Sequence, residues 1–212
     1  MTLLPESWPR LARGLLLTVL SLPAVAAGLS PDQLIKTTAE EVLSILRADP
    51  EVANGDTRKV VDVVETKVLG HFDFERMTRL AVGKNWRSTT AAQKQSLTRS
   101  FRTLLVRTYA VALAQFRDRK VEYRPLEAAP SGPEVLVHTA VETPAGKPLN
   151  IDYRMVAVGD QWKVYDVLVD GVSLVVNYRS LFDSTVEKSG VDGLVALLDD
   201  KNAQAAAGTL NQ

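Results

Sequence analysis

The chain contains no cysteine and only two histidines among its 212 residues. Without thiols it has no disulfides, no cysteine nucleophile and no thiolate metal site. His71 and His138 lie far apart in the sequence, and neither has a partner at the i,i+4 spacing that a helical metal site uses. We therefore predict no metal site and no resident cofactor.

The sequence also lacks the short motifs of nucleophilic and nucleotide-dependent catalysis. It has no G-x-S-x-G, no phosphate-binding loop and no G-x-G-x-x-G. Asp166 and Asp170 are the best candidates for a carboxylate pair, but four residues along a strand separate them by roughly 13 Å, too far to share a proton. We predict that Asp166 binds a backbone amide or an arginine and that Asp170 occupies a turn before Gly171. The chain is predicted not to be an enzyme.

Neither sign of charge dominates, because 25 Lys and Arg residues balance 25 Asp and Glu residues. This balance gives no indication of a nucleic-acid partner. An apolar fraction of 46% and a length of 212 residues suit one compact domain. The longest apolar run, Leu15 to Val25, is shorter than the roughly 20 residues needed to cross a bilayer.

That run is instead typical of a signal peptide. Arg10 and Arg13 precede it, and the small-residue site Ala24-Val25-Ala26 ends it. We predict a signal peptide over residues 1–26, cleaved after Ala26 or one residue later. Since the chain has no cysteine, no lipoprotein acylation site is expected after the cleavage site. The interpretation places the mature protein in a bacterial periplasm, with full secretion as the alternative.

The mature sequence is predicted to begin with helices. Helical periodicity and capping residues predict helices over residues 31–49, 56–69 and 74–82. Thr90 and Gln93 form a capping-box pattern that starts a fourth helix over residues 90–117. Such a helix would be roughly 42 Å long at 1.5 Å per residue. We therefore expect a bend or break near Ser100.

From Lys120 the apolar period changes from about four residues to two, which predicts strands. They are expected around residues 121–124, 135–142, 149–155 and 162–169. Short turns between them predict an antiparallel meander, and Pro125 makes the first strand an edge strand because proline cannot donate into a ladder. In the last strand one face is expected to carry Trp162, Val164, Asp166 and Leu168, opposite Lys163, Tyr165, Val167 and Val169.

The chain is predicted to end in helices. One begins near Gly171 and runs toward Lys188, and another runs from Asp192 through Leu198. The first begins with two turns that are apolar on nearly every side, so something, which could be a ligand, is expected to enclose them. We predict a domain over residues 27–202 and a flexible tail over residues 203–212. The fold class is α+β: one twisted antiparallel sheet of about four strands packed against helices.

Apolar side chains face inward from both predicted layers. The candidate lining residues are Leu105, Tyr109, Ala112, Leu113 and Phe116 on the long helix, Val135, Val137, Ile151, Tyr153, Met155 and Val164 on the strands, and Val172, Val175, Val176 and Phe182 on the helix that follows. They either fill an ordinary core or line a cavity, and periodicity alone does not distinguish the two. Tyr109 is either a cavity wall with a polar tip or a core tyrosine bonded to backbone.

Several stretches resemble the MlaC or toluene-tolerance family of periplasmic phospholipid carriers. Residues 162–173 fit the pattern W-x-x-Y-D-x-x-x-x-G-V-S, and residues 72–90 are similar to the family's short helix and tryptophan loop. The family's Q-K/R-x-x-x-x-x-x-F-R-x-x-L-x-x-x-Y pattern is matched by Gln93, Lys94, Phe101, Arg102, Leu105 and Tyr109, and its I-D-G-L by residues 191–194. The resemblance covers about residues 31–200, but the loop 127–134 matches no family motif.

This resemblance implies an NTF2-like cradle with an apolar cavity that holds phospholipid acyl chains, with phospholipid as cargo and no cofactor. It further implies a lipid shuttle between an outer-membrane lipoprotein complex and an inner-membrane ABC transporter bearing an MCE-domain protein. Such a shuttle would maintain the lipid asymmetry of the outer membrane, without binding nucleic acid or inserting stably in a membrane. The alternatives are a structural adaptor of the cell envelope with a filled core and, less favoured, a small NTF2-like periplasmic enzyme.

Overall fold

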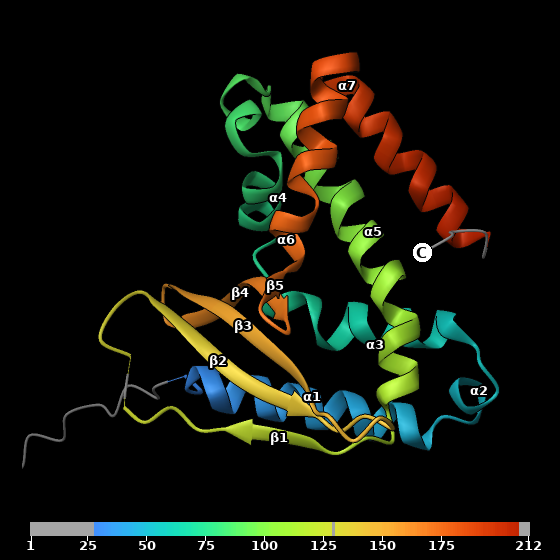
Figure 1. Cartoon of the computed structure of the whole chain (residues 1–212), viewed down its shortest axis with the longest axis vertical. Helices are drawn as coiled ribbons and strands as arrows, with labels where there is room; N and C mark the ends of the chain where they lie inside the picture. Colours follow the sequence, from blue (N-terminus) through green and yellow to red (C-terminus); the bar gives the residue numbers. More distant parts are fainter. Residues whose placement is uncertain (1–27, 129, 208–212) are drawn as a thin grey trace, which may run out of the picture.

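A computed structural model of the chain describes residues 28–128 and 130–207. The predicted signal peptide and residues 208–212 of the predicted tail lie outside the described residues. Figure 1 shows a lower part, made of the sheet with α1 and α3, and an upper part made of packed helices. The long helix α5 (Ala91–Phe116) runs through both parts.

The first half of the chain is helical, as predicted. Its elements are α1 (Pro31–Ala48), α2 (Pro50–Ala53), α3 (Thr57–Lys67), the 3-10 turn η1 (Leu69–His71), α4 (Phe74–Val82) and the 3-10 helix η2 (Gly83–Ser88). Aspartates at three helix starts, Asp49, Asp56 and Asp73, accept backbone N–H groups of the following turn. This capping fixes where α2, α3 and α4 begin.

The predicted capping box at Thr90 and Gln93 is confirmed and starts α5. The predicted break near Ser100 is wrong, because α5 continues as one helix to Phe116. The Ser100 hydroxyl donates to Asp199 Oδ1 at 2.6 Å, and the Asn202 side chain donates to the Ser100 carbonyl at 2.9 Å. Both partners lie on the last helix, α7 (Arg179–Ala206), so Ser100 holds two helices together and does not interrupt one.

The strands form one antiparallel meander, which confirms the predicted fold class. In order across the sheet they are β1 (Val121–Arg124), β2 (Glu134–Val141), β3 (Leu149–Val158), β4 (Gln161–Val169) and β5 (Val172–Ser173). β1 is an edge strand, as Pro125 predicted. The two-residue β5 makes the sheet five-stranded, where about four strands were expected.

A β-bulge in β4 overturns the predicted alternation of that strand. Arg154 pairs with Asp166 but Met155 pairs with Val164, so Tyr165 has no residue directly opposite. Residues after the bulge therefore exchange faces. Val167 and Val169 lie on the same face as Val164, while Asp166 and Leu168 lie on the other.

The C-terminal helices begin later and extend further than expected. Residues 172–173 pair with β4, so helix starts only at α6 (Leu174–Asn177) and not at Gly171. α7 is broken at Gly190, whose φ of 69° is open to glycine, and this break separates the two predicted helices. The second half of α7 continues past Leu198 to Ala206, so residues 203–206 of the predicted tail are helical.

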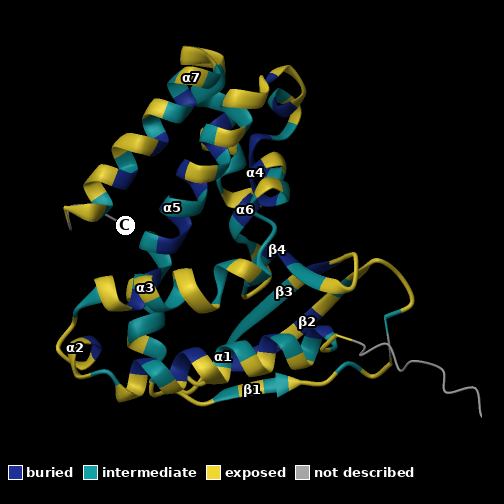
Figure 2. Cartoon of the chain, turned by 180° about the vertical axis from the view of Figure 1, so that it is seen from behind, coloured by how far each residue is buried: buried dark blue, intermediate teal, exposed yellow. Residues whose placement is uncertain are grey.

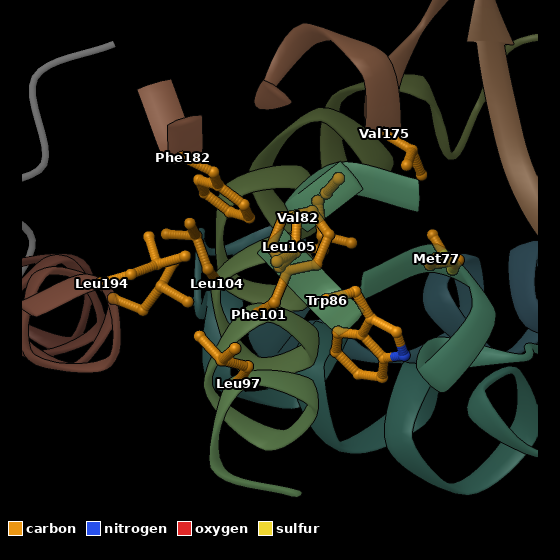
Figure 3. Close-up of a cluster of buried hydrophobic side chains, with 12 residues drawn as sticks. Met77, Val82, Trp86, Leu97, Phe101, Leu104, Leu105, Val175, Phe182 and Leu194 are labelled. Carbon is orange, nitrogen blue, oxygen red and sulfur yellow. The ribbon is translucent and has the colours of Figure 1, made fainter. Parts of the chain in front are cut away.

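The buried side chains form three separate clusters. The sheet cluster is Ile35, Val137, Met155 and Val164. The helical cluster, drawn in Figure 3, is Met77, Ala81, Val82, Trp86, Leu97, Phe101, Leu104, Leu105, Val175, Phe182, Leu194 and Leu198. The lower cluster is Val42, Leu46, Val52, Val60 and Ala110. Figure 2 shows that α5, which contributes to two of them, is mostly intermediate in burial, with buried and exposed residues along it. The sheet and the upper helices thus have different cores.

Candidate functional site

One face of the sheet is almost entirely apolar and lies toward α1. We call it the inner face. It includes Val121 and Tyr123 on β1, Val135, Val137, Thr139 and Val141 on β2, Leu149, Ile151, Tyr153, Met155 and Ala157 on β3, Trp162, Val164, Val167 and Val169 on β4, and Val172 on β5. The valines and isoleucine suit a pleated surface that packs against apolar groups.

Only part of the inner face is covered. α1 packs against β1 and β2, and Val137, Met155 and Val164 are at most 1% exposed. Coverage decreases toward β5, where Val172 is 61% exposed. We call the part of the inner face around Val137, Met155 and Val164 the covered end. The residues between the covered end and Val172 are half-buried. Together with Val172 they form what we call the open part: Ile151, Tyr153, Val167, Val169 and Val172.

The helices α3 and α5 do not pack closely against the open part. α5 packs extensively on α3, α4 and α7, and within residues 28–128 and 130–207 it has no comparable packing on a strand. α3 packs on α1 and α5, and the η1 turn that follows it reaches β4. Half-buried apolar side chains line these helices: Val61, Val64 and Val68 at α3, and Tyr109, Ala112, Leu113 and Phe116 on α5. The fold therefore leaves apolar surface on both layers incompletely buried.

The predicted lining residues separate into three groups by burial. Those that are buried are Leu105, Val137, Met155, Val164, Val175 and Phe182. Those that are half-buried are Tyr109, Ala112, Leu113, Phe116, Val135, Ile151 and Tyr153. Val172 and Val176 are exposed. The buried group is divided between the helical cluster and the sheet cluster, so the structure does not place all the predicted residues on one continuous wall.

Protein side chains enclose the start of the C-terminal helix only in part, so its enclosure by a ligand stays a prediction. Val175 is fully buried in the helical cluster, but Val172 and Val176 are 61% and 46% exposed. The reason is that residues 172–173 are a strand, which directs Val172 to the inner face beside Val169. Apolar surface is therefore exposed at Val172, in the open part, and at Val176 on α6.

Tyr109 is half-buried against the helical cluster beside Tyr178. Burial raises the pKa of Tyr109, whose hydroxyl is hydrogen-bonded to that of Tyr178, and burial also raises the pKa of Tyr178 to about 12. The polar tip of Tyr109 therefore has a side-chain partner, not the backbone partner that one alternative required.

Two polar groups of the inner face, on β2 and β3, have local partners. The Thr139 hydroxyl donates to the Ile151 carbonyl at 2.8 Å. Burial raises the pKa of Tyr153, and Thr139 is its hydrogen-bonding neighbour. Because these groups already have partners, the inner face presents an apolar surface to any ligand.

The opposite face of the sheet carries charged as well as apolar side chains, and the structure confirms the predictions for both aspartates. Asp166 is 1% exposed and accepts from the Val175 amide at 3.3 Å and from Arg154 Nη1 at 3.4 Å. Asp170 occupies the predicted turn and accepts from the Asn150 amide at 3.0 Å. His138 Nδ1 lies 2.8 Å from an Asp152 oxygen. Across the described part of the chain, no three His, Asp or Glu side chains are grouped so that they could hold a metal ion.

The sequence did not reveal two residues of the open part, Val167 and Val169, or the half-buried valines at α3. Val61, Val64 and Val68 form a visible stripe but give no sign that they remain half-buried. Val167 and Val169 were assigned to the other face, because the alternation carries no signal of the bulge.

A shallow hollow at the α1–α2 turn, lined by Ile45, Ala48, Asp49, Pro50 and Glu51, contains none of the predicted residues. Among the described helices, none has the length and hydropathy that crossing a bilayer requires.

Comparisons with known proteins agree on one family. Residues 36–200 match the family model described as MlaC protein. Toluene tolerance protein ttg2D of Pseudomonas putida is 25% identical over 185 residues, which cover 86% of this chain and 85% of that protein. The intermembrane phospholipid transport system binding protein MlaC of Haemophilus influenzae is 21% identical over 178 residues, covering 82% of this chain and 83% of that protein.

A solved structure gives the same result at higher identity. It is the phospholipid-binding protein from Ralstonia solanacearum in complex with a phospholipid, and it is 37% identical with a TM-score of 0.77. The match covers 84% of this chain and 99% of that chain.

Proposed function

The chain belongs to the MlaC family, and on that premise we propose that it binds the acyl chains of a phospholipid against the open part of the inner face. The observation that carries this proposal is the incomplete burial of an apolar sheet face, from half-buried Ile151 to Val172 at 61% exposure. The phospholipid complex of the Ralstonia solanacearum relative, at a TM-score of 0.77, supports the same ligand class.

The chemistry of a diacyl lipid explains why such a protein is needed. About 30 CH₂ groups at roughly 0.8 kcal/mol each make exposure of the tails to water cost on the order of 24 kcal/mol. A carrier must therefore cover the tails with apolar surface, while the charged headgroup remains in water because burying a phosphate without partners is costly. Val167, Val169 and Ile151 supply such surface, and the polar groups beside them are already hydrogen-bonded.

We propose a location and a route for this lipid. The protein acts in the periplasm after removal of residues 1–26 and carries lipid between an outer-membrane lipoprotein complex and an inner-membrane ABC transporter bearing an MCE-domain protein. Its role is to maintain the lipid asymmetry of the outer membrane. The family membership and the name of the Haemophilus influenzae relative, which refers to intermembrane phospholipid transport, support this proposal.

No covalent step is proposed. The buried carboxylate nearest the site, Asp166, is committed to an arginine, a serine and a backbone amide. Lipid should therefore leave the protein chemically unchanged.

Mass spectrometry of organic extracts tests the proposal directly. Protein purified without detergent is expected to yield membrane phospholipid at a saturable stoichiometry, and to exchange it with vesicles. Longer acyl chains should strengthen binding until the apolar surface is filled, whereas changing the headgroup should matter less. Empty extracts, together with no exchange and no competition with a fluorescent fatty-acyl probe, would refute the carrier and favour the adaptor with a filled core.

A further inference from the structure

The short segment 172–177 joins the sheet to the upper helices. Val172 pairs with Val169 at the edge of the inner face, while Val175 is fully buried in the helical cluster. Val172 is exposed in the open part, and Val176, the residue after Val175, is exposed as well. The position of this segment therefore determines where apolar surface is presented at the rim of the site.

One buried carboxylate on the opposite face holds this segment. Asp166 Oδ2 accepts from the Ser173 hydroxyl at 2.7 Å and from Arg154 Nη1 at 3.4 Å, and Asp166 Oδ1 accepts from the Val175 amide at 3.3 Å. The β-bulge places Asp166 on this face, opposite Arg154. Asp166 thus contacts β3, β5 and the first turn of α6 from a position that is 1% exposed.

Ser173 extends the same network by one bond. Its hydroxyl gives its single proton to Asp166 and accepts from the Val176 amide at 3.0 Å, as the N-cap of α6. Asp166 therefore holds the Val175 amide by a direct hydrogen bond, and it is linked to the Val176 amide through the Ser173 hydroxyl. These hydrogen bonds fix the backbone next to both exposed valines. A short four-residue helix such as α6 has little stability of its own, so its position depends on these caps and on Val175.

We infer that Asp166 is a positioning residue for the lipid site: it fixes segment 172–177, and with it Val172 at the rim of the open part, and so sets how long an acyl chain is retained. This inference rests on the proposed function. A carboxylate is suited to the task because hydrogen bonds to an ionised acceptor are about twice as strong as neutral ones. The side chain itself contacts no lipid, since it lies on the other side of the sheet.

The test uses Asp166→Asn, which keeps the shape and removes the charge, with Asp152→Asn as the matched control on the same face. Because the chain has no cysteine, a spin label on Val176→Cys reports this segment alone, and one on Ala91→Cys reports α5. In the D166N background the label at 176 should become more mobile while the label at 91 does not change. Release of phospholipid to acceptor vesicles should be about tenfold faster, as expected from losing charge-assisted hydrogen bonds, and D152N should release it at the unmodified rate.

Each outcome decides the inference. Unchanged mobility at position 176 and unchanged release in D166N overturn it, as does equal mobilisation of both labels, because that would show only a general loss of structure. If D166N does not fold, Ser173→Ala removes the bond to Asp166 and the cap on the Val176 amide but leaves the Asp166 bonds to Arg154 and the Val175 amide, and it should give a change of the same kind; no change in S173A would then overturn the inference. Failure of the carrier proposal is recognised separately, because the unmodified protein would carry no lipid while the labels still report the segment.

Discussion

Two parts of the inner face have similar residues but different surroundings. At the covered end, Val137, Met155 and Val164 are at most 1% exposed, beneath Ile35 of α1. In the open part, Val169 is half-buried and Val172 is 61% exposed, although both are valines on the same face of the same sheet. Residue type therefore determines which face is apolar, whereas the placement of the helices determines which part remains free for a ligand.

The comparison is tested most strongly by removing apolar side chains. Met155→Ala at the covered end should lower the free energy of unfolding by about 2–5 kcal/mol, because it leaves a cavity in a packed cluster. Ile151→Ala in the open part should cost clearly less and should weaken phospholipid binding. Urea denaturation and lipid stoichiometry measure both. Equal destabilisation of the two variants would show that the open part is packed like the covered end.

Adding bulk tests the same contrast in the opposite direction. Val137→Trp and Val175→Trp place an indole in filled clusters, and each should lower the free energy of unfolding by about 1–3 kcal/mol or more. Val169→Trp has half-buried surroundings, so its stability should change less while the amount of co-purified lipid falls. The comparison would fail if V169W were as destabilised as V137W and kept its lipid.

Charge at two exposed valines gives a smaller effect on stability. Val172→Asp on the inner face and Val158→Asp at the far end of β3 alter residues that are 61% and 49% exposed. Both should change the free energy of unfolding by no more than about 0.5 kcal/mol, as is usual for surface positions. Only V172D should weaken binding of a fluorescent fatty-acyl probe, because a carboxylate at the rim opposes contact with acyl chains. Equal binding by V172D and V158D would remove Val172 from the site.

The sequence predicted the faces of β2 and β3 correctly because alternation is a local property. Val137, Tyr153 and Met155 lie on the face expected of them. Two kinds of partner for Asp166, a backbone amide and an arginine, were also predicted, and the Val175 amide is only nine residues away along the chain. Such features depend on strand geometry and on short loops, which residue order specifies directly.

Which residues of the inner face are buried by helices could not be predicted in the same way. Whether Val169 is buried depends on where α1 and α5 lie, and these helices are distant from it in the sequence. The bulge at Tyr165 likewise depends on the register between β3 and β4, which alternation within β4 does not reveal. The strand at residues 172–173 was missed for the same reason, since a helical pattern was assumed where two residues join the sheet.

The smallest effect concerns titration at the covered end. Tyr123 on β1 lies opposite Thr139, in the row of residues that continues through Ile151 and Val169 to Val172. Burial, reinforced by the Glu40 carboxylate, raises the pKa of Tyr123 to about 12. A raised pKa means that folding favours the neutral phenol, so this stabilisation is complete below the ordinary tyrosine pKa of about 10 and is lost as the pH rises to about 12.

The unfolding free energy should therefore decrease between about pH 10 and about pH 12, and Tyr123→Phe should decrease less steeply than the unmodified protein, because phenylalanine has no phenol to ionise. Tyr178 also has a pKa raised to about 12 by burial, so part of the decrease should persist in Y123F. Urea denaturation at several pH values measures both slopes. Identical slopes would show that Tyr123 is not buried by α1, and the covered end of the inner face would then extend less far toward β1 than the structure indicates.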